Sequence, residues 1–165
     1  MPLQFVCEDM AEFEADAIVY AATVEALTRG DAQPAPGTEK EEELEILSQL
    51  GDGELRIVYA NDLYCTYVIH TLCPVWQGGD KGECDQLAKC WRDCLQLAAD
   101  HDCRSVGFPL IGAGIFGFPP ETAVKIAAEA VEEFSKTRDM EVSLVFDDED
   151  TCRRCRSLCP DAAEG

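Results

Sequence analysis

The chain's most informative segment reads Pro109-Leu110-Ile111-Gly112-Ala113-Gly114-Ile115-Phe116-Gly117-Phe118-Pro119-Pro120. It lies between a short apolar run, residues 105–108, that is typical of a strand and an amphipathic stretch that is typical of a helix. Glycines permit positive φ and let backbone N–H groups approach a ligand, and a helix start favours negative charge. Ligands of open α/β sheets usually sit in such a crevice at the carboxyl end of a strand. The segment therefore predicts a loop that binds a phosphate or pyrophosphate.

Two other interpretations of this segment stay open. Gly112-x-Gly114-x-x-Gly117 also matches the glycine fingerprint of dinucleotide-binding folds. In those folds the helix begins inside the motif, whereas Pro119-Pro120 here places the helix start after the last glycine. Too little chain follows Gly117 for a second mononucleotide-binding half. The segment can also be a tight strand-to-helix turn without a ligand.

Outward from this segment, strands alternate with helices. Apolar runs predict strands at residues 3–7, 17–22, 55–59, 67–70, 105–108 and 142–146. Helical periodicity predicts helices at 39–50, 83–99 and 119–134, and a final helix after the acidic run 147–150. Residues 23–38 are predicted to form an irregular loop because they contain Pro34, Pro36 and Gly37, and the glutamates of 39–45 a solvated helix face. The alternation predicts one α/β domain with a mostly parallel sheet.

Charge and composition exclude several classes of partner. The chain has 33 acidic and 13 basic side chains, a formal net charge of −20, and no basic cluster that could hold nucleic acid or an anionic membrane. Hydrophobic residues at 47% and a mean hydropathy of −0.13 indicate a folded globular protein. No apolar run approaches the ~20 residues of a membrane span, and Met1-Pro2-Leu3-Gln4 does not begin a signal peptide. We therefore expect a cytoplasmic protein.

The cysteines indicate reduced thiols. Ten cysteines are a smaller share of 165 residues than the ~8–10% of disulfide scaffolds. One cluster, Cys152-x-x-Cys155-x-x-x-Cys159, offers three thiolates to a metal, but a structural zinc site needs a fourth ligand. We favour free thiols over a metal site here and expect no cofactor.

Three motifs, in this order along the chain, resemble those of the macrodomain family. They are Asp16–Thr23, Tyr67–Trp76 and the loop from Gly112 to Pro119, and the resemblance runs from about Leu3 to Phe146. It implies a three-layer α/β/α sandwich with a mixed, mostly parallel central sheet. Residues 1–150 would form the macrodomain-like domain, and 151–165 a cysteine-rich C-terminal helix or tail of the same domain. It also implies that the chain binds ADP-ribose or a related adenine nucleotide, and some family members hydrolyse ADP-ribose linkages.

The resemblance assigns an adenine side to the predicted site. Asp9 matches the acidic residue that accepts a hydrogen bond from the adenine amino group. Met10 matches the apolar residue that lines the adenine pocket, and Phe146 matches one of its walls. Without the resemblance, Asp9 merely ends a strand and Phe146 is a core aromatic residue.

The resemblance places the phosphates and distal ribose at the glycine-rich loop. The residues whose backbone amides would hold the pyrophosphate are Gly112, Ala113, Gly114 and Ile115. Phe116 matches the aromatic residue that packs on the distal ribose, although it can also be a core residue. Ala22 and Gly117 complete the predicted lining.

Two departures from the family pattern bear on catalysis. The family's strand typically ends Asn-Ala-Ala-Asn, and its last Asn orients the ribose, whereas this chain has Tyr20-Ala21-Ala22-Thr23. The run of glycines that follows in the family is replaced by a shorter segment, 24–37, that contains prolines. We therefore expect a binding module with weak or no catalysis, in which Thr23 and Asp31 are the candidate catalytic residues. His70 is predicted to be a structural histidine.

Two further functions remain alternatives. One is a divergent ADP-ribosyl or O-acetyl-ADP-ribose hydrolase, and the other is a pseudo-macrodomain that acts as a protein-interaction scaffold. The expected partners are ADP-ribose or a similar small nucleotide and, as a further candidate, an ADP-ribosylated protein. The charge of −20 argues against a long anionic polymer, whereas salt screens distant carboxylates from one small ligand within about 10 Å.

Overall fold

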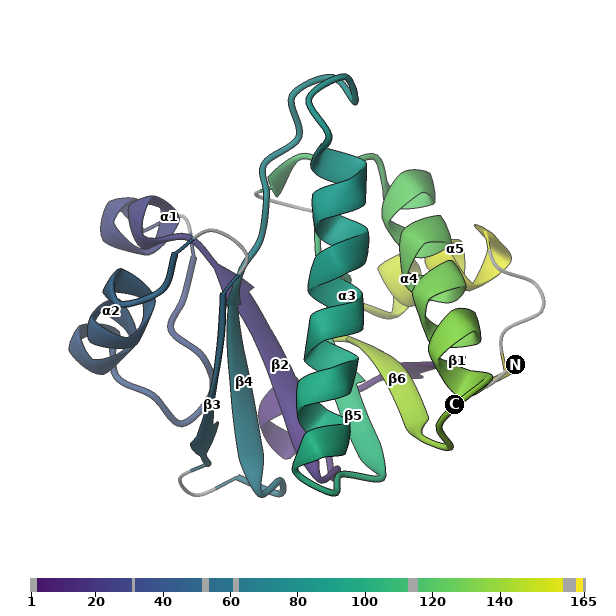
Figure 1. The fold of residues 1–165 in the computed structure, drawn as a ribbon, viewed down its shortest axis with the longest axis horizontal. Helices are drawn as coiled ribbons and strands as arrows, with labels where there is room; N and C mark the ends of the chain where they lie inside the picture. The colour runs from purple at the N-terminus through teal and green to yellow at the C-terminus, as the bar shows by residue number, and fades with distance from the viewer. Residues whose placement is uncertain are drawn as a thin grey trace.

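The computed structural model describes residues 3–30, 32–51, 54–60, 63–112, 116–158 and 163–164, the last pair by backbone alone (Figure 1). In chain order the elements are β1 (Leu3–Cys7), the 3-10 helix η1 (Met10–Glu12), β2 (Ala17–Ala22), α1 (Val24–Arg29), α2 (Lys40–Ser48), β3 (Leu55–Tyr59), β4 (Tyr67–Leu72), α3 (Glu83–Asp100), β5 (Ser105–Phe108), α4 (Pro120–Ser135), β6 (Glu141–Phe146), α5 (Glu149–Leu158) and β7 (Ala163–Glu164). None of the described helices is both long enough and apolar enough to cross a bilayer.

The described strands form one sheet in the order β3-β4-β2-β5-β6-β1-β7. All paired neighbours run parallel except β3 and β4, which are antiparallel. Helices α1 and α2 pack on one face, and α3, α4 and α5 pack with the other (Figure 1). The predicted three-layer α/β/α sandwich with a mixed, mostly parallel sheet is thus confirmed.

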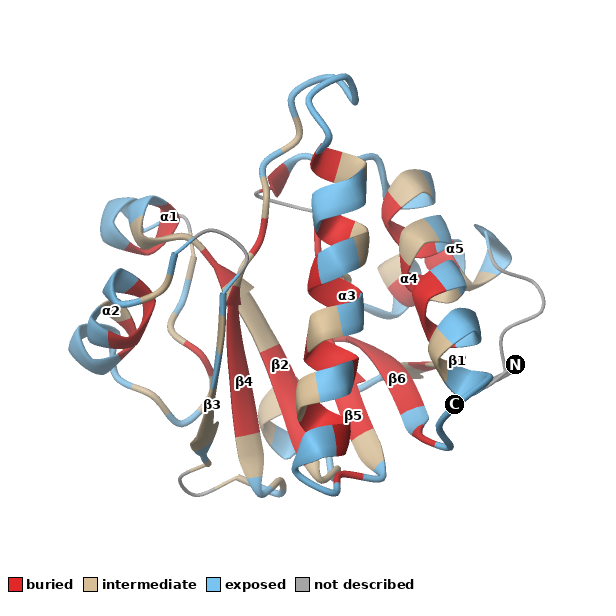
Figure 2. Ribbon diagram, viewed as in Figure 1, coloured by how far each residue is buried: buried red, intermediate tan, exposed pale blue. Residues whose placement is uncertain are grey.

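Alternating side chains of the strands divide the core between the two faces. The larger cluster fills the space between the sheet and α3, α4 and α5, where buried residues line the strands and the inward sides of the helices (Figure 2). At its centre Trp91 of α3 stacks on Phe108 of β5, with ring centroids 4.0 Å apart. A smaller cluster of Ala22, Leu27 and Leu47 holds α1 and α2 against the other face. Both faces are therefore buried, as the continuous apolar strands require.

Part of the predicted loop at 23–38 is helical, so that prediction was wrong for α1. Thr23 caps the helix, because its Oγ1 accepts a hydrogen bond from the N–H of Ala26 at 3.0 Å. Gly30 ends it in the left-handed conformation with φ of 83°. Pro34 and Pro36, which suggested a loop, follow Gly30 in the sequence and therefore do not interrupt the helix.

The prediction of a solvated face on α2 was wrong for Glu43. Its side chain is fully buried, and its Oε1 lies 2.9 Å from Nδ1 of His70, which is also fully buried in β4. A carboxylate can be buried when a ring N–H from the neighbouring layer meets it. His70 is therefore structural, as predicted, and it ties α2 to the sheet.

Candidate functional site

Four of the predicted site residues meet at one edge of the sheet. Asp9 follows β1, Ala22 ends β2, Gly112 follows β5 and Phe146 ends β6. These four strands are parallel neighbours in the order β2-β5-β6-β1, so their carboxyl ends share an edge. In open α/β sheets this edge is where ligands bind.

The described part of the glycine-rich loop closes on itself. The N–H of Phe118 donates to the carbonyl of Gly112 at 2.8 Å. Gly112 has φ of 97°, and a Cβ at this position would lie 2.8 Å from Cδ2 of Leu87 in α3 and 3.1 Å from the Phe118 ring. Only glycine fits here, because both the backbone conformation and the space exclude a side chain. Gly117 also has a positive φ, 82°. Ala113, Gly114 and Ile115 lie outside the described residues.

Phe116 and Phe146 are largely buried in the main core cluster. The Phe116 carbonyl accepts a hydrogen bond from the Trp76 N–H at 2.7 Å. Phe146 stacks on Phe5, with ring planes only 7° apart, and its carbonyl accepts from the Glu8 N–H. Both residues are core aromatics in this structure, as the alternative interpretation held, and their contacts with a ligand stay a prediction.

The predicted adenine side has an exposed acceptor beside an apolar residue. Asp9 is exposed and caps η1, because its Oδ1 accepts a hydrogen bond from the Ala11 N–H at 3.0 Å. A carboxylate has about four acceptor positions, so this bond leaves it able to accept another. Met10 is half-buried and packs with Ile18 and Val68. The two predicted residues are therefore adjacent, one polar and open and the other apolar.

One of the two candidate catalytic residues lies in the described part of the chain. Oγ1 of Thr23 accepts the capping bond of α1 and keeps its O–H as a donor, and Asp31 lies outside the described residues. Tyr20 packs on the face of the sheet that α1 and α2 cover. Leu87 of α3, which lies next to Gly112, is on the other face. Burial, together with the negative charge of Glu43, raises the pKa of Tyr20 to about 12. Tyr20 is thus a phenol at neutral pH and not a base.

The C-terminal thiols are buried instead of facing a shared centre. Cys152 and Cys155 of α5 belong to the main core cluster, and burial raises the pKa of each thiol. Cys159, the third predicted ligand, lies outside the described residues. Within the described ranges, no three His, Cys, Asp or Glu side chains come together in a way that could hold a metal ion.

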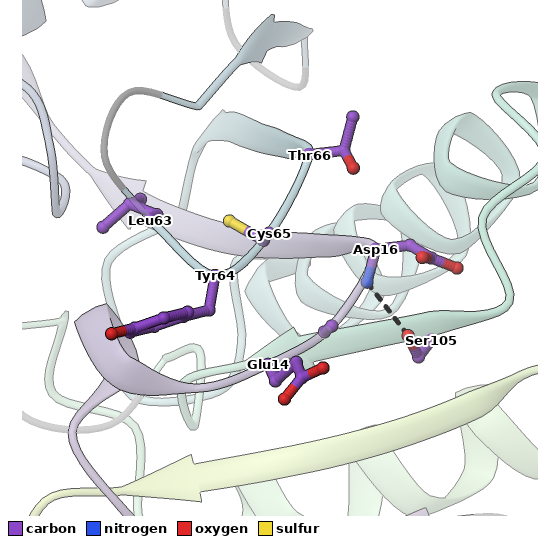
Figure 3. A pocket seen from close by; sticks show the side chains of 8 residues that line it. Glu14, Asp16, Leu63, Tyr64, Cys65, Thr66 and Ser105 are labelled. Atoms are coloured by element: carbon purple, nitrogen blue, oxygen red, sulfur yellow. Dashed lines mark hydrogen bonds between the residues drawn. The ribbon is translucent and has the colours of Figure 1, made fainter.

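A pocket that sequence reasoning missed lies at the opposite edge of the sheet. It has a volume of about 560 Å³ and is lined by Glu14, Ala15, Asp16, Leu63, Tyr64, Cys65, Thr66 and Ser105 (Figure 3). These residues precede β2 and β4 or begin β5, so no sequence motif connects them. Much of their polarity serves the fold. The Asp16 N–H donates to Oγ of Ser105 at 2.9 Å, and Oδ2 of Asp16 accepts from the Arg104 N–H at 2.7 Å. Burial raises the pKa of the Cys65 thiol, so it is a poor nucleophile.

Comparison with known proteins gives consistent relatives. A family model described as Macro domain matches residues 32–127, which include the glycine-rich loop. A macro domain-containing protein of Mesorhizobium japonicum is 38% identical over 142 residues, covering 84% of this chain and 81% of the relative. An O-acetyl-ADP-ribose deacetylase of Klebsiella pneumoniae is 36% identical over 165 residues, covering 94% of each chain.

Solved structures share the fold over nearly the whole chain. The Oceanobacillus iheyensis macrodomain with bound MES superposes with a TM-score of 0.80 and 26% identity, covering 96% of this chain and 90% of that one. A Trypanosoma brucei macrodomain in complex with ADP-ribose has a TM-score of 0.75 and 25% identity, covering 96% of this chain and 68% of that one. Together with the sheet order and the closed loop at Gly112, these matches establish that this chain belongs to the Macro domain family.

Proposed function

We propose that this chain binds ADP-ribose or a related adenine nucleotide at the carboxyl ends of β1, β2, β5 and β6, with weak or no hydrolysis. The observation that carries the proposal is the closed turn at Gly112, which sits between β5 and α4 on the same edge as Asp9. Such a turn presents backbone amides to an anion, and the exposed carboxylate of Asp9 can accept a bond from an amino group. The Trypanosoma brucei relative, which was solved with ADP-ribose, supports the same ligand class.

The departures around β2 support binding over turnover. Thr23 stands where the family has its second Asn, and its oxygen already caps α1. Tyr20 stands where the family has its first Asn and keeps its proton at neutral pH. Losing the group that orients a ribose commonly lowers a rate by orders of magnitude. A divergent hydrolase is the second candidate because of the Klebsiella pneumoniae deacetylase relative.

Titration calorimetry with ADP-ribose tests the binding proposal. Absence of heat at millimolar ligand would refute it and favour the interaction scaffold. If the protein binds, Asp9→Ala should weaken ADP-ribose and AMP by roughly ten- to a hundredfold, the usual worth of one hydrogen bond to a charged group. Ribose 5-phosphate, which has no adenine, should bind both proteins equally.

Two control variants isolate the adenine contact. Asp9→Ser keeps an oxygen that can cap η1 but is too short to reach a base, so it should behave like Asp9→Ala. Glu12→Ala removes an exposed carboxylate from the same 3-10 helix and should leave every affinity within twofold. Equal losses for ADP-ribose and ribose 5-phosphate would contradict the role given to Asp9.

A turnover assay separates a reader from a hydrolase. Acetate release from O-acetyl-ADP-ribose, and ADP-ribose release from a modified protein, should both be slow or absent. Rapid release that disappears in Thr23→Ala would overturn the assignment as a binding module and identify Thr23 as part of the chemistry.

A further inference from the structure

One buried carboxylate lies outside the residues considered so far. Glu83 begins α3 and is 2% exposed, although the residues just before it, 77–82, are exposed. Its Oε2 accepts hydrogen bonds from the backbone N–H groups of Gln77 at 2.5 Å and Gly79 at 3.2 Å, and its Oε1 accepts from Lys81 at 2.8 Å. The connection between β4 and α3 projects beyond the start of α3 (Figure 1). Three of its backbone N–H groups donate to this one side chain.

The protonation state of Glu83 follows from these bonds. Burial alone would raise the pKa of its carboxyl group, but the bonds from backbone N–H groups lower the pKa to about 2. Glu83 is therefore a carboxylate at neutral pH and an acceptor for all three amides.

The segment that Glu83 organises is linked to the glycine-rich loop through Trp76. Gly79 has φ of 90°, and a Cβ there would lie 3.0 Å from Cη2 of Trp76, so the segment folds back on the indole. The backbone N–H of Trp76 donates to the Phe116 carbonyl, and the indole ring of Trp76 packs on the Phe118 ring, with ring centroids 5.2 Å apart. A Cβ on Gly117 would lie 3.4 Å from Cβ of Trp76. Trp76 thus contacts the described end of the loop, at residues 116–118.

We infer that Glu83 is a positioning residue for the phosphate-binding loop, acting through the 77–81 backbone and Trp76 on residues 116–118. The inference rests on the proposed function, since it assumes that the Gly112–Gly117 loop holds the phosphates of the ligand. Glu83 itself touches no ligand in this account. It fixes the position of residues 116–118, and an anion held at this end of the loop is lost when they shift, because hydrogen bonds weaken steeply with angle.

Charge and position predict opposite effects, which makes the test decisive. Removing a carboxylate from a chain of net charge −20 should slightly favour an anionic ligand. Glu83→Gln, however, puts an NH2 group where the carboxylate accepted an N–H. At least one of the three backbone N–H groups that bind Glu83 therefore loses its partner. We expect Glu83→Gln to raise the dissociation constant for ADP-ribose at least tenfold.

Two comparisons separate positioning from a general loss of structure. Adenosine lacks both phosphates and the distal ribose, so its affinity should change less than twofold in Glu83→Gln. Asp85→Asn removes an exposed carboxylate from the same helical turn and should leave ADP-ribose binding unchanged or slightly tighter.

Indole fluorescence reports the contact directly. The chain has two tryptophans, and Trp91→Phe leaves Trp76 as the only one. In that background Glu83→Gln should shift the Trp76 emission to longer wavelength, and Asp85→Asn should not. If Glu83→Gln does not fold, Gly79→Ala perturbs the same contact from an exposed position and should give the same selective loss.

Each outcome decides the inference. A wild-type protein that binds ADP-ribose, beside a Glu83→Gln variant with unchanged affinity or with equal losses for ADP-ribose and adenosine, refutes the inference alone. A wild-type protein that binds no ADP-ribose refutes the proposed function, and the inference falls with it.

Discussion

Replacing His70 by Leu should destabilise the protein by about 3–5 kcal/mol, the usual cost of leaving a buried carboxylate without its partner. Both side chains of the Glu43–His70 contact are 0% exposed. Neither Oε2 of Glu43 nor Nε2 of His70 has a hydrogen-bond partner among the described residues. The 2.9 Å bond is thus the main compensation for burying the carboxylate, and without it Glu43 stays desolvated and unpaired.

Variants of Glu43 and His70 should differ in stability in a definite order. Glu43→Leu should also destabilise, since it leaves the imidazole buried without an acceptor. The double variant Glu43→Leu/His70→Leu should be more stable than His70→Leu alone, because two apolar side chains of similar volume bury no charge. For a chain of this length, the expected loss in His70→Leu corresponds to a fall in Tm of roughly 6–20 °C.

Urea unfolding of the four proteins, followed by circular dichroism, measures these values as a double-mutant cycle. Glu42→Leu is the matched control, because Glu42 is an exposed neighbour on α2 and its loss should stay within about 0.5 kcal/mol. A cost below 1 kcal/mol for His70→Leu would refute this interpretation of the contact. A double variant whose loss of stability relative to wild type equals the sum of the two single losses would refute it as well.

Four further outcomes follow from the structure. Thr23→Ala should cost about 1 kcal/mol in urea unfolding because it removes the cap of α1, and Thr23→Ser should recover most of it. Gly112→Ala should cost about 1–3 kcal/mol and weaken ADP-ribose binding, since its Cβ would overlap Leu87 at a φ of 97°. The wild-type protein should lose stability as pH rises from about 10, where an unfolded tyrosine ionises, to about 12, the pKa of Tyr20 in the fold, and Tyr20→Phe should lose less over that range. Finally, raising NaCl from low to physiological concentration should strengthen ADP-ribose binding in calorimetry, because salt screens repulsion between the ligand and a chain of charge −20; weaker binding in salt would point to a cationic contact instead.

The elements that the sequence predicts correctly are those with strong periodicity. The continuous apolar run of β2 predicts a strand that is buried on both faces. The amphipathic pattern of α3 predicts a helix that is buried on one face. For α1 the cap residues Thr23 and Gly30 were visible in the sequence, but a six-residue helix has too few positions to show a period. The nearby prolines therefore outweighed them.

Contacts between distant segments set the limit for the site. The burial of Glu43 depends on His70, 27 residues later, and no local pattern marks one glutamate among several as buried. Glu83 had a local signal, since three glycines and a tryptophan precede it closely, but its role appears only when three backbone amides are seen to donate to it. The family resemblance predicted the edge of the sheet where the site lies. The contacts of Glu83 and Trp76 that support the glycine-rich loop could be found only in the structure.

The position of β1 between β6 and β7 has a consequence for synthesis on the ribosome. Leu3 pairs with Val142 and Gln4 with Ala163, so among the described residues β1 has no strand partner until β6 has been synthesised. At roughly 5–20 residues per second, the strand waits roughly 7–30 s for β6. During that delay Leu3-Gln4-Phe5-Val6-Cys7 is an unpaired apolar segment, and the adjacent Glu8 and Asp9 place two negative charges at its end. The charges of Glu8 and Asp9 should therefore reduce aggregation of this segment while it is still unpaired.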